Sequence, residues 1–329
     1  MPEVSYGVLR CIIEHMNFDT RISLSSRCSK ISRVEKSIPL RVNEISFTPD
    51  LVKINKTQYE IVSEDPKMKE KTPHQTLALR STDYYSNSSI VKKFPIHYGK
   101  EEASKKAVEL LLGGRNSIRV KVFIINRRSY HYMEPLFGIS TMKVRLFRNW
   151  DVGLPKLHPL IESPVKEFGF ELEHPTDFEN PIAQTAEKLV IWRYTFNQMD
   201  TWVEVHGNIP NKDVMIERFS PVWTDDKIFE LIEYWIKTRK AVGSKFSVIR
   251  VTHGSIDMFL EKIKKQFGGT FVKVEDTDRR MVTEVTAISI KLNLKSKIVV
   301  HETLLGSSEM FRLLIKVMAD ESEGQNLVC

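Results

Sequence analysis

Cysteine is scarce in this sequence of 329 residues. The three that occur, Cys11, Cys28 and Cys329, are far apart along the chain. A disulfide framework or a structural zinc site needs paired or clustered cysteines, so the sequence argues against both. Sparse, unpaired cysteines are typical of a reducing compartment. We therefore expect a cytoplasmic or nuclear protein that holds no metal.

Long apolar runs are also missing. The first residues, MPEVSYGVLR, lack the apolar core of a secretion signal, and no apolar stretch approaches the length of a membrane-spanning helix. We therefore expect no membrane partner. Hydrophobic residues still make up 41% of the chain, which is ordinary for a globular protein. At this length the chain forms one large domain or two moderate ones.

Motifs that carry chemistry are absent as well. Gly113-Gly114-Arg115 follows a helical pattern, whereas a phosphate-binding loop follows a strand, so these glycines indicate the end of a helix. His301-Glu302 has no second histidine at the spacing of a zinc-protease helix, and no Gly-x-Ser-x-Gly occurs. We identify no catalytic, cofactor-binding or metal-binding residues, and we expect a protein that is not an enzyme.

The chain is basic, with a net charge of +7, but its Lys and Arg residues are scattered in small groups. Pairs such as Lys92-Lys93 and Arg279-Arg280 are more typical of solvated surfaces than of a phosphate-binding tract. Nucleic-acid binding is therefore disfavoured. It would require these residues to converge into one basic stripe in the fold.

The first forty residues predict three short helices. In Ser5–Met16, apolar residues recur at helical spacing, and we expect them to form one face. Asp19 can cap a second helix and Ser29 a third, which Pro39 ends. The apolar residues of the first helix are Leu9, Ile12, Ile13 and Met16, and those of the second are Ile22 and Leu24. Helices this short must pack on each other and on another surface, either the rest of the chain or a partner.

Short strands are predicted after Pro39. Segments 51–54 and 57–62 read as a hairpin joined by Asn55-Lys56, segment 63–76 as a polar loop, and Thr76–Arg80 as a further strand. A helix is expected from Lys100 until Gly113-Gly114.

A repeat follows. Six strand-like segments have starts 22 to 33 residues apart, near Ile118, Met142, Lys166, Lys188, Asp213 and Phe246. One strand in each unit of this length is the spacing of leucine-rich repeats. Helices capped by Thr224 and Ser255 separate the last units, which predicts a parallel sheet with helices on its outer side. Two strands (285–292 and 297–304) and a closing helix (Glu309–Ala319) are expected at the end.

Together these patterns predict a mixed α/β (α+β) fold. We divide the chain into a helical segment (1–40), a β-hairpin with an irregular connection (41–99), a degenerate leucine-rich-repeat-like β/α scaffold (100–300), and a C-terminal cap and tail (301–329).

Several stretches resemble a large, nematode-expanded family of F-box-associated proteins whose members carry a domain of unknown function. The resemblance covers roughly Ser5 to Val300. It is carried by SYGVLRCIIEHM, by RISLSSRCSKISRVEKSIPLRV, by KINKTQYEI and by ELLLGGRNSIRV. Its most specific pieces are Ser26–Cys28, Glu35–Leu40 and Leu112–Arg115. A standard F-box begins with Leu-Pro, and Ser5-Tyr6-Gly7 stands there in this sequence.

The resemblance implies an adaptor. An F-box docks on the Skp-type adaptor of a cullin ubiquitin ligase, and a C-terminal domain then holds a protein substrate. By this resemblance the docking residues would be Leu9, Ile12, Ile13, Met16, Ile22 and Leu24. Two other functions remain open. The chain could be an interaction scaffold without a ubiquitin role, in which the helices only cap the sheet, or, with less support, a nucleic-acid-binding protein.

Overall fold

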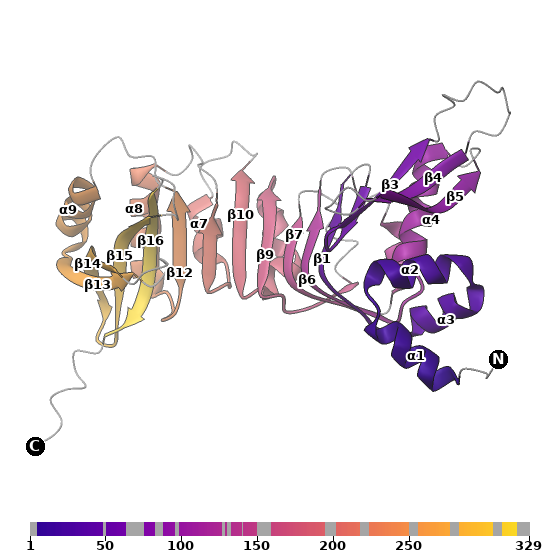
Figure 1. Ribbon diagram of the computed structural model, residues 1–329. Helices are drawn as coiled ribbons and strands as arrows, with labels where there is room; N and C mark the ends of the chain where they lie inside the picture. Colours follow the sequence, from indigo (N-terminus) through magenta and orange to yellow (C-terminus); the bar gives the residue numbers. More distant parts are fainter. Residues whose placement is uncertain are drawn as a thin grey trace, which may run out of the picture. The chain divides into compact units, whose positions relative to one another are not determined.

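The computed structural model forms two compact units, Met1–Val165 and Lys166–Cys329 (Figure 1). The residues that it describes are 5–48, 51–63, 76–82, 88–95, 99–126, 129, 133–139, 141–149, 159–194, 202–217, 224–249, 256–276, 283–304 and 311–320. The mixed α/β class expected from the sequence is confirmed. The boundary between the units falls inside the scaffold drawn at 100–300, and the N-terminal helices belong to the same unit as the first strands.

The first unit begins with three helices, α1 (Tyr6–His15), α2 (Phe18–Arg27) and α3 (Ser29–Ser37). Their positions agree with the sequence, but two of the expected caps are wrong. Asn17 caps α2 by accepting a hydrogen bond from Thr20 N at 2.8 Å. Ser29 lies inside α3, whose first turn has no side-chain cap.

Asp19 has a different role from the expected one. Its carboxylate accepts hydrogen bonds from the hydroxyl groups of Thr57 and Tyr59 on β3 (Thr57–Ser63). The carboxylate therefore connects α2 to the sheet.

One sheet runs through the first unit, in the order β7-β6-β1-β2-β3-β4-β5, with β8 beside β7. Strands β8, β7, β6 and β1 are parallel, and the pairs from β1–β2 to β4–β5 are antiparallel. Asn55 has a φ of 57° in the β2–β3 turn, so the predicted hairpin is confirmed. The remaining bounds are β1 (Leu40–Phe47), β2 (Leu51–Ile54), β4 (Thr76–Thr82), β5 (Ser88–Pro95), α4 (Gly99–Leu111), β6 (Ser117–Ile125), η3 (Glu134–Gly138), β7 (Thr141–Asn149) and β8 (Ile161–Glu162).

Helix α4 covers part of this sheet. Its buried residues Ala107, Val108 and Leu111 face a narrow cleft lined by Phe47 and Tyr59, among others. The helix therefore contributes its apolar face to the core of the unit. Most of the predicted polar loop 63–76 lies outside the described residues.

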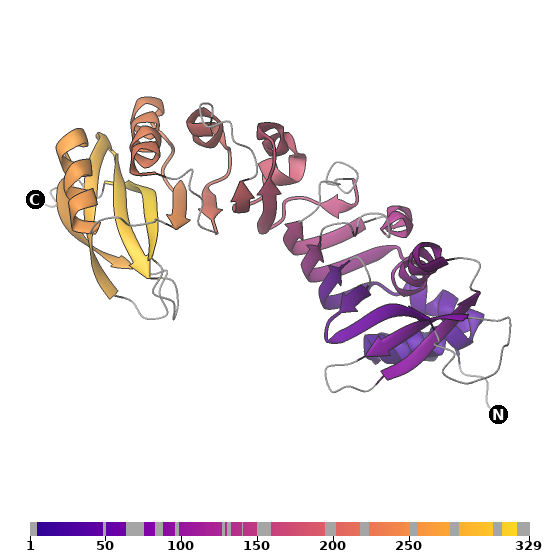
Figure 2. The same ribbon diagram turned by 90° about the horizontal axis from the view of Figure 1, so that it is seen from above.

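The second unit also contains one sheet, in the order β9-β10-β11-β12-β16-β15-β14-β13. The first four strands are parallel and the others antiparallel. Helices α7, α8 and α9 lie along one side of these strands (Figure 2). The bounds are β9 (Glu167–Leu172), η4 (Pro175–Glu179), α6 (Pro181–Thr185), β10 (Lys188–Tyr194), α7 (Trp202–Asn208), β11 (Asp213–Ile216), α8 (Asp225–Thr238), β12 (Lys245–Ile249), α9 (Ile256–Phe267), β13 (Thr270–Asp276), β14 (Thr283–Asn293), β15 (Ser296–Leu304) and β16 (Phe311–Ala319).

The repeat strands lie where the sequence placed them. All six predicted segments are strands that begin within one residue of the expected start, and every printed pairing among them is parallel. The predicted cap of α8 is confirmed, since Thr224 Oγ1 accepts a hydrogen bond from Lys227 N at 3.4 Å. The predicted cap of α9, Ser255, lies outside the described residues. No helix in the described parts of the chain is both long enough and apolar enough to cross a membrane.

The closing helix predicted at Glu309–Ala319 is wrong, because Phe311–Ala319 forms β16. This strand pairs with β15 on one edge and β12 on the other. Leu313, Leu314, Ile315 and Val317 are all buried. A strand buried on both faces carries a continuous apolar run, which periodicity alone does not distinguish from a buried helix.

The packing of β9 against β10 gives a stability prediction. A Cβ added to Gly169 would lie 2.6 Å from Cζ2 of Trp192, which is 2% exposed. We expect Gly169→Ala to lower the free energy of unfolding by about 1–3 kcal/mol, because the indole cannot yield in a packed core. Urea unfolding followed by tryptophan fluorescence measures this. Gly138→Ala is the control, since a Cβ there meets no atom within 4 Å. Equal midpoints for the two variants would contradict the close packing.

Candidate functional site

One face of α1 holds this helix against α3. Ile13 is 2% exposed and forms a cluster with Val34 and Ile38, and Leu9 and Ile31 pack against that cluster. Ile13 and Leu9 lie four residues apart, so they are neighbours on the helix surface. This face of α1 is therefore buried by the fold.

Helix α1 also exposes three apolar side chains to solvent. Tyr6 is 59% exposed, Val8 52% and Ile12 46%. Val8 and Ile12 are one helical turn apart, so their side chains form a continuous apolar strip. Among the described residues, seven large hydrophobic side chains are at least 46% exposed, and three of them are on this one helix.

The predicted docking residues divide between surface and interior. Ile12 is exposed, and Leu9, Met16 and Leu24 are half-buried. The other two, Ile13 and Ile22, are buried in the chain at 2% and 1% exposure. The six residues therefore do not form one exposed surface.

Sequence reasoning missed Tyr6 and Val8. The four-residue spacing of Val8 and Ile12 was visible, but it competes with the stripe Leu9, Ile13 and Met16. The pattern of a short helix does not tell which of two adjacent apolar stripes faces the core.

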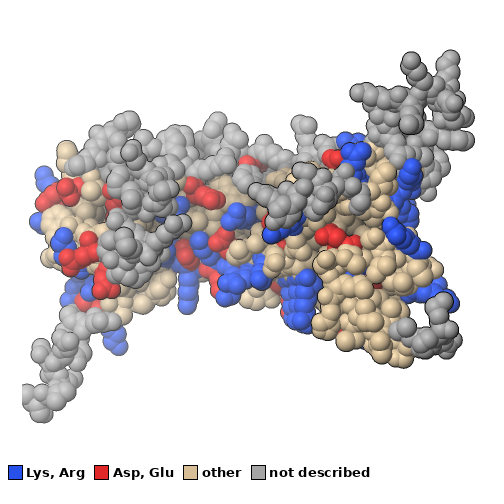
Figure 3. All heavy atoms as spheres, viewed as in Figure 1, with Lys and Arg blue, Asp and Glu red and all other residues tan. Residues whose placement is uncertain are grey.

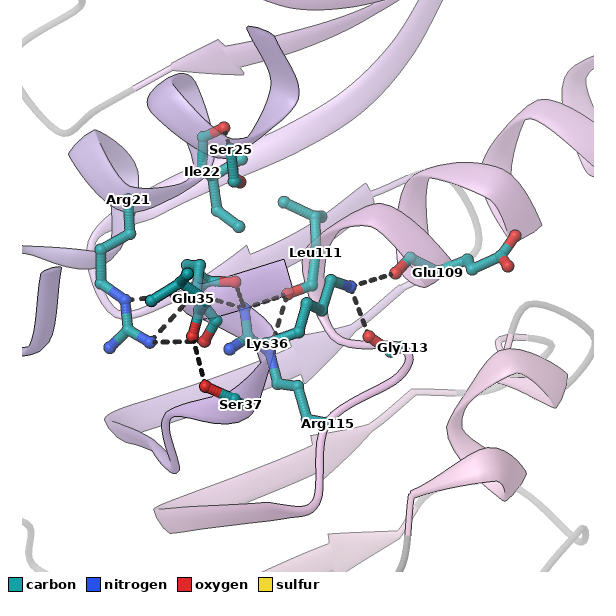
Figure 4. Close-up of polar contacts among 11 residues, drawn as sticks. Arg21, Ile22, Ser25, Glu35, Lys36, Ser37, Glu109, Leu111, Gly113 and Arg115 are labelled. Carbon is teal, nitrogen blue, oxygen red and sulfur yellow. Dashed lines mark hydrogen bonds and ion pairs between the residues drawn. The ribbon is translucent and has the colours of Figure 1, made fainter. Parts of the chain in front are cut away.

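A buried carboxylate anchors the helices to the rest of the unit (Figure 4). Glu35 of α3 is fully buried, and its Oε1 lies 3.0 Å from the guanidinium of Arg21 on α2. The NH2 group of Arg115, which lies between α4 and β6, donates to both carboxylate oxygens of Glu35 at 2.8 and 2.9 Å. Arg115 also donates to the carbonyl of Leu111. One carboxylate thus joins three separate segments of the chain.

Lys36 extends this cluster to the end of α4. Its Nζ donates to the carbonyl oxygen of Glu109 at 2.8 Å and to that of Gly113. Carbonyls at a helix C-terminus lack helical partners and carry partial negative charge, so a cation there is favourable. Burial, assisted by the positive charge of Arg115, lowers the pKa of Lys36 to about 8.

The glycines before Arg115 end the helix, as the sequence predicts. Gly113 N donates to the carbonyl of Glu109, and Gly114 has a φ of +67°, a conformation that favours glycine. The segments 35–40 and 112–115, singled out for the family resemblance, therefore meet in space. Their common role here is to join α3 to α4.

The anchor is unsuited to chemistry. Glu35 and Arg115 are fully enclosed, with 0% and 1% exposure, and a substrate cannot reach them. In the described parts of the chain, no group of three or more His, Cys, Asp and Glu side chains could hold a metal ion. The candidate site is therefore the apolar strip of α1, and the Glu35 cluster is its support.

Removing the charge of Glu35 tests this support. Glu35→Gln leaves two buried guanidinium groups without a counter-ion, and we expect a loss of about 3–5 kcal/mol in the free energy of unfolding. Glu44→Gln is the matched control. Glu44 forms a partly exposed pair with Lys53 at 3.0 Å, and its loss is expected to cost less than about 1 kcal/mol. Chemical denaturation measures both variants, and similar losses would contradict the anchoring role.

Lys36 makes stability depend on pH. The pKa of Lys36 is about 8 in the folded chain and 10.5 without the fold, so between these values the unfolded state binds more protons. The free energy of unfolding therefore rises with pH in this window. Burial raises the pKa of Tyr59 in the folded chain above the ordinary value of 10.0. Above about pH 10 the unfolded tyrosine therefore loses a proton that the folded one keeps, and the free energy of unfolding falls. The rise is thus expected between about pH 8 and about pH 10.

Lys36→Met removes one titrating group, so the same unfolding series in this variant should show a smaller rise; the remainder comes from Lys240, whose pKa is also lowered by burial. An identical slope in both proteins would show that Lys36 does not titrate in this range.

Comparison with known proteins assigns one part of the chain. Residues 99–249, from the start of α4 to the end of β12, match the family described as a domain of unknown function, DUF3557. No curated protein and no solved structure matches the chain. The chain thus contains a DUF3557 domain that begins after the N-terminal helices.

Proposed function

We propose that this protein is a non-enzymatic adaptor, a substrate-recognition subunit of a cullin-type ubiquitin ligase. The N-terminal helices dock on a Skp-type adaptor, and the repeat-like strands bind a protein substrate. The observation that carries the proposal is the apolar strip of Val8 and Ile12, which are exposed one turn apart on α1, with exposed Tyr6 in the first turn of the same helix. The family resemblance of the first forty residues supports it.

The energetics of the strip suit docking. Burying an aliphatic side chain contributes roughly 1.5–3 kcal/mol, and a few central residues dominate most interfaces. Helix α1 is already fixed by Ile13 and its neighbours, so binding does not have to order it. A stable interface buries roughly 1,600 Å² in total. The strip would therefore form the centre of such an interface, with polar residues around it.

A second candidate function is an interaction scaffold without a ubiquitin role. Ile22 and Glu35 are buried in the first unit, so α2 and α3 have a structural role whether or not a partner binds. In this alternative the three helices only cap the sheet, and the exposed strip of α1 has no adaptor as its partner.

The experiment is a pull-down of purified Skp-type adaptors with full-length variants. Deleting residues 1–40 would remove Ile22, Glu35 and Ile38 from the core, so substitutions on the exposed strip are cleaner. We expect Val8→Glu with Ile12→Glu to abolish binding while the thermal midpoint stays close to that of the parent. The control is Arg10→Ala with Glu14→Ala, which changes two exposed polar residues of α1 and preserves net charge.

The outcomes separate the two candidates. Binding by the parent and the control, but not by the strip variant, supports the adaptor. A well-folded parent that binds no Skp-type adaptor would refute the adaptor and leave the scaffold. Equal binding by all three proteins would refute docking through α1.

A further inference from the structure

A row of positive charges crosses the parallel strands of the first unit. Arg41 of β1 lies beside Arg119 of β6, which lies beside Lys143 of β7. Lys121 and Arg145 follow two residues further along β6 and β7, and side chains two residues apart in a strand point to the same side. All five side chains are exposed. We call these five residues the cation row.

The cation row is compact. Adjacent strands are about 4.8 Å apart, and alternate residues of one strand are about 6.6 Å apart. Five cations thus occupy a surface of roughly 10 by 7 Å. Lys and Arg side chains gather at the lower middle of the space-filling view, where the first residues of β6 and β7 lie (Figure 3).

Most of these charges are not neutralised by the fold. In the described parts of the chain, Arg41, Arg119, Lys121 and Arg145 form no ion pair. Lys143 pairs with Glu162 at 2.9 Å, and both side chains are about half exposed. Like charges on neighbouring strands repel each other, so this arrangement costs stability.

The second unit shows that the strand arrangement does not require such a row. There Glu167, Lys188, Asp213 and Lys245 occupy neighbouring positions on β9, β10, β11 and β12. Their signs alternate, and Lys188 pairs with Glu167 at 3.3 Å. The cation row of the first unit is therefore a local feature of its sequence, and ligand binding would explain it.

We propose that the cation row binds an extended, acidic segment of a protein partner. Alternate side chains of an extended peptide repeat at about the same interval as those of β6, so carboxylates at every second position face Arg119 and Lys121 in turn. Three of the five cations are arginines. The planar guanidinium binds a carboxylate through two parallel hydrogen bonds, which gives direction as well as charge.

The surroundings favour a peptide over nucleic acid. Single-stranded nucleic acids are held by aromatic side chains on which bases stack, beside a basic groove. In the described residues, the large aromatic side chains with comparable exposure are Tyr6 on α1 and Phe271 in the second unit. Neither is on β1, β6 or β7.

This inference rests on the proposed adaptor role for its biological meaning, since it names the class of substrate. The two can fail separately. Adaptor docking depends on α1, and peptide binding depends on β1, β6 and β7.

The test is fluorescence anisotropy with the full-length chain. The probe is a labelled twelve-residue peptide with Glu at alternate positions and Thr between them, and the second probe is a labelled oligothymidylate of equal charge. We expect the peptide to bind at low salt and the oligonucleotide to bind more weakly. Arg119→Gln with Lys121→Gln should weaken peptide binding about tenfold. Lys262→Gln with Lys265→Gln, which removes the same charge from exposed positions of α9, should leave it unchanged.

Three results would overturn the proposal. The first is no peptide binding by the parent. The second is an equal loss in both double variants, which would indicate attraction by net charge alone. The third is tighter binding of the oligonucleotide with the same sensitivity to Arg119→Gln and Lys121→Gln, which would make the row a nucleic-acid site.

Discussion

The buried carboxylate of Glu35 is the interaction on which the first unit depends. It faces Arg21 from the preceding helix and Arg115 from a segment eighty positions later. The three residues are sequestered from water, so no ion or solvent can substitute for a missing partner. A buried pair of this kind is a weak source of net stability, but it fixes which segments must meet. Here it fixes the N-terminal helices relative to α4, and Lys36 reinforces the same contact at the end of that helix.

This anchor determines which apolar residues of the helices are free to contact a partner. Ile13 and Ile22 are used by the fold, so a docking surface made from all the apolar residues of the first two helices would require the helices to separate. The strip of Val8 and Ile12 requires no such rearrangement, because both side chains are already exposed. An adaptor that docks on this strip therefore meets a preformed surface. One that needs Ile13 must first break the packing of α1 against α3, at a cost that lowers its affinity.

The sequence predicted the elements of the fold better than their contacts. The six repeat strands, the hairpin at Asn55 and the cap Thr224 each follow from local patterns, namely apolar alternation, turn residues and capping side chains. Two of the failures have a common cause, because each depends on a distant partner. Asp19 accepts hydrogen bonds from β3 instead of capping its own helix, and Phe311–Ala319 is a strand because β12 and β15 flank it. The burial of Arg115, which no local pattern indicates, likewise depends on the distant Glu35. For the candidate site, the sequence located α1 but not the exposed side of it.

Among the described residues, the buried charges of the first unit are paired, whereas most of its exposed charges in the cation row are not. Arg21 and Arg115 share a single carboxylate in the interior, where an unpaired charge would be too costly to keep. Arg41, Arg119 and Arg145 lie on the surface, where water and salt screen their mutual repulsion and a counter-charge is not required for folding. Charges that the fold does not need to pair remain available to a ligand. Repulsion within the cation row therefore lowers the stability of the unit slightly when no ligand is bound. A partner that presents several negative charges, spaced like alternate residues of a strand, relieves this repulsion most.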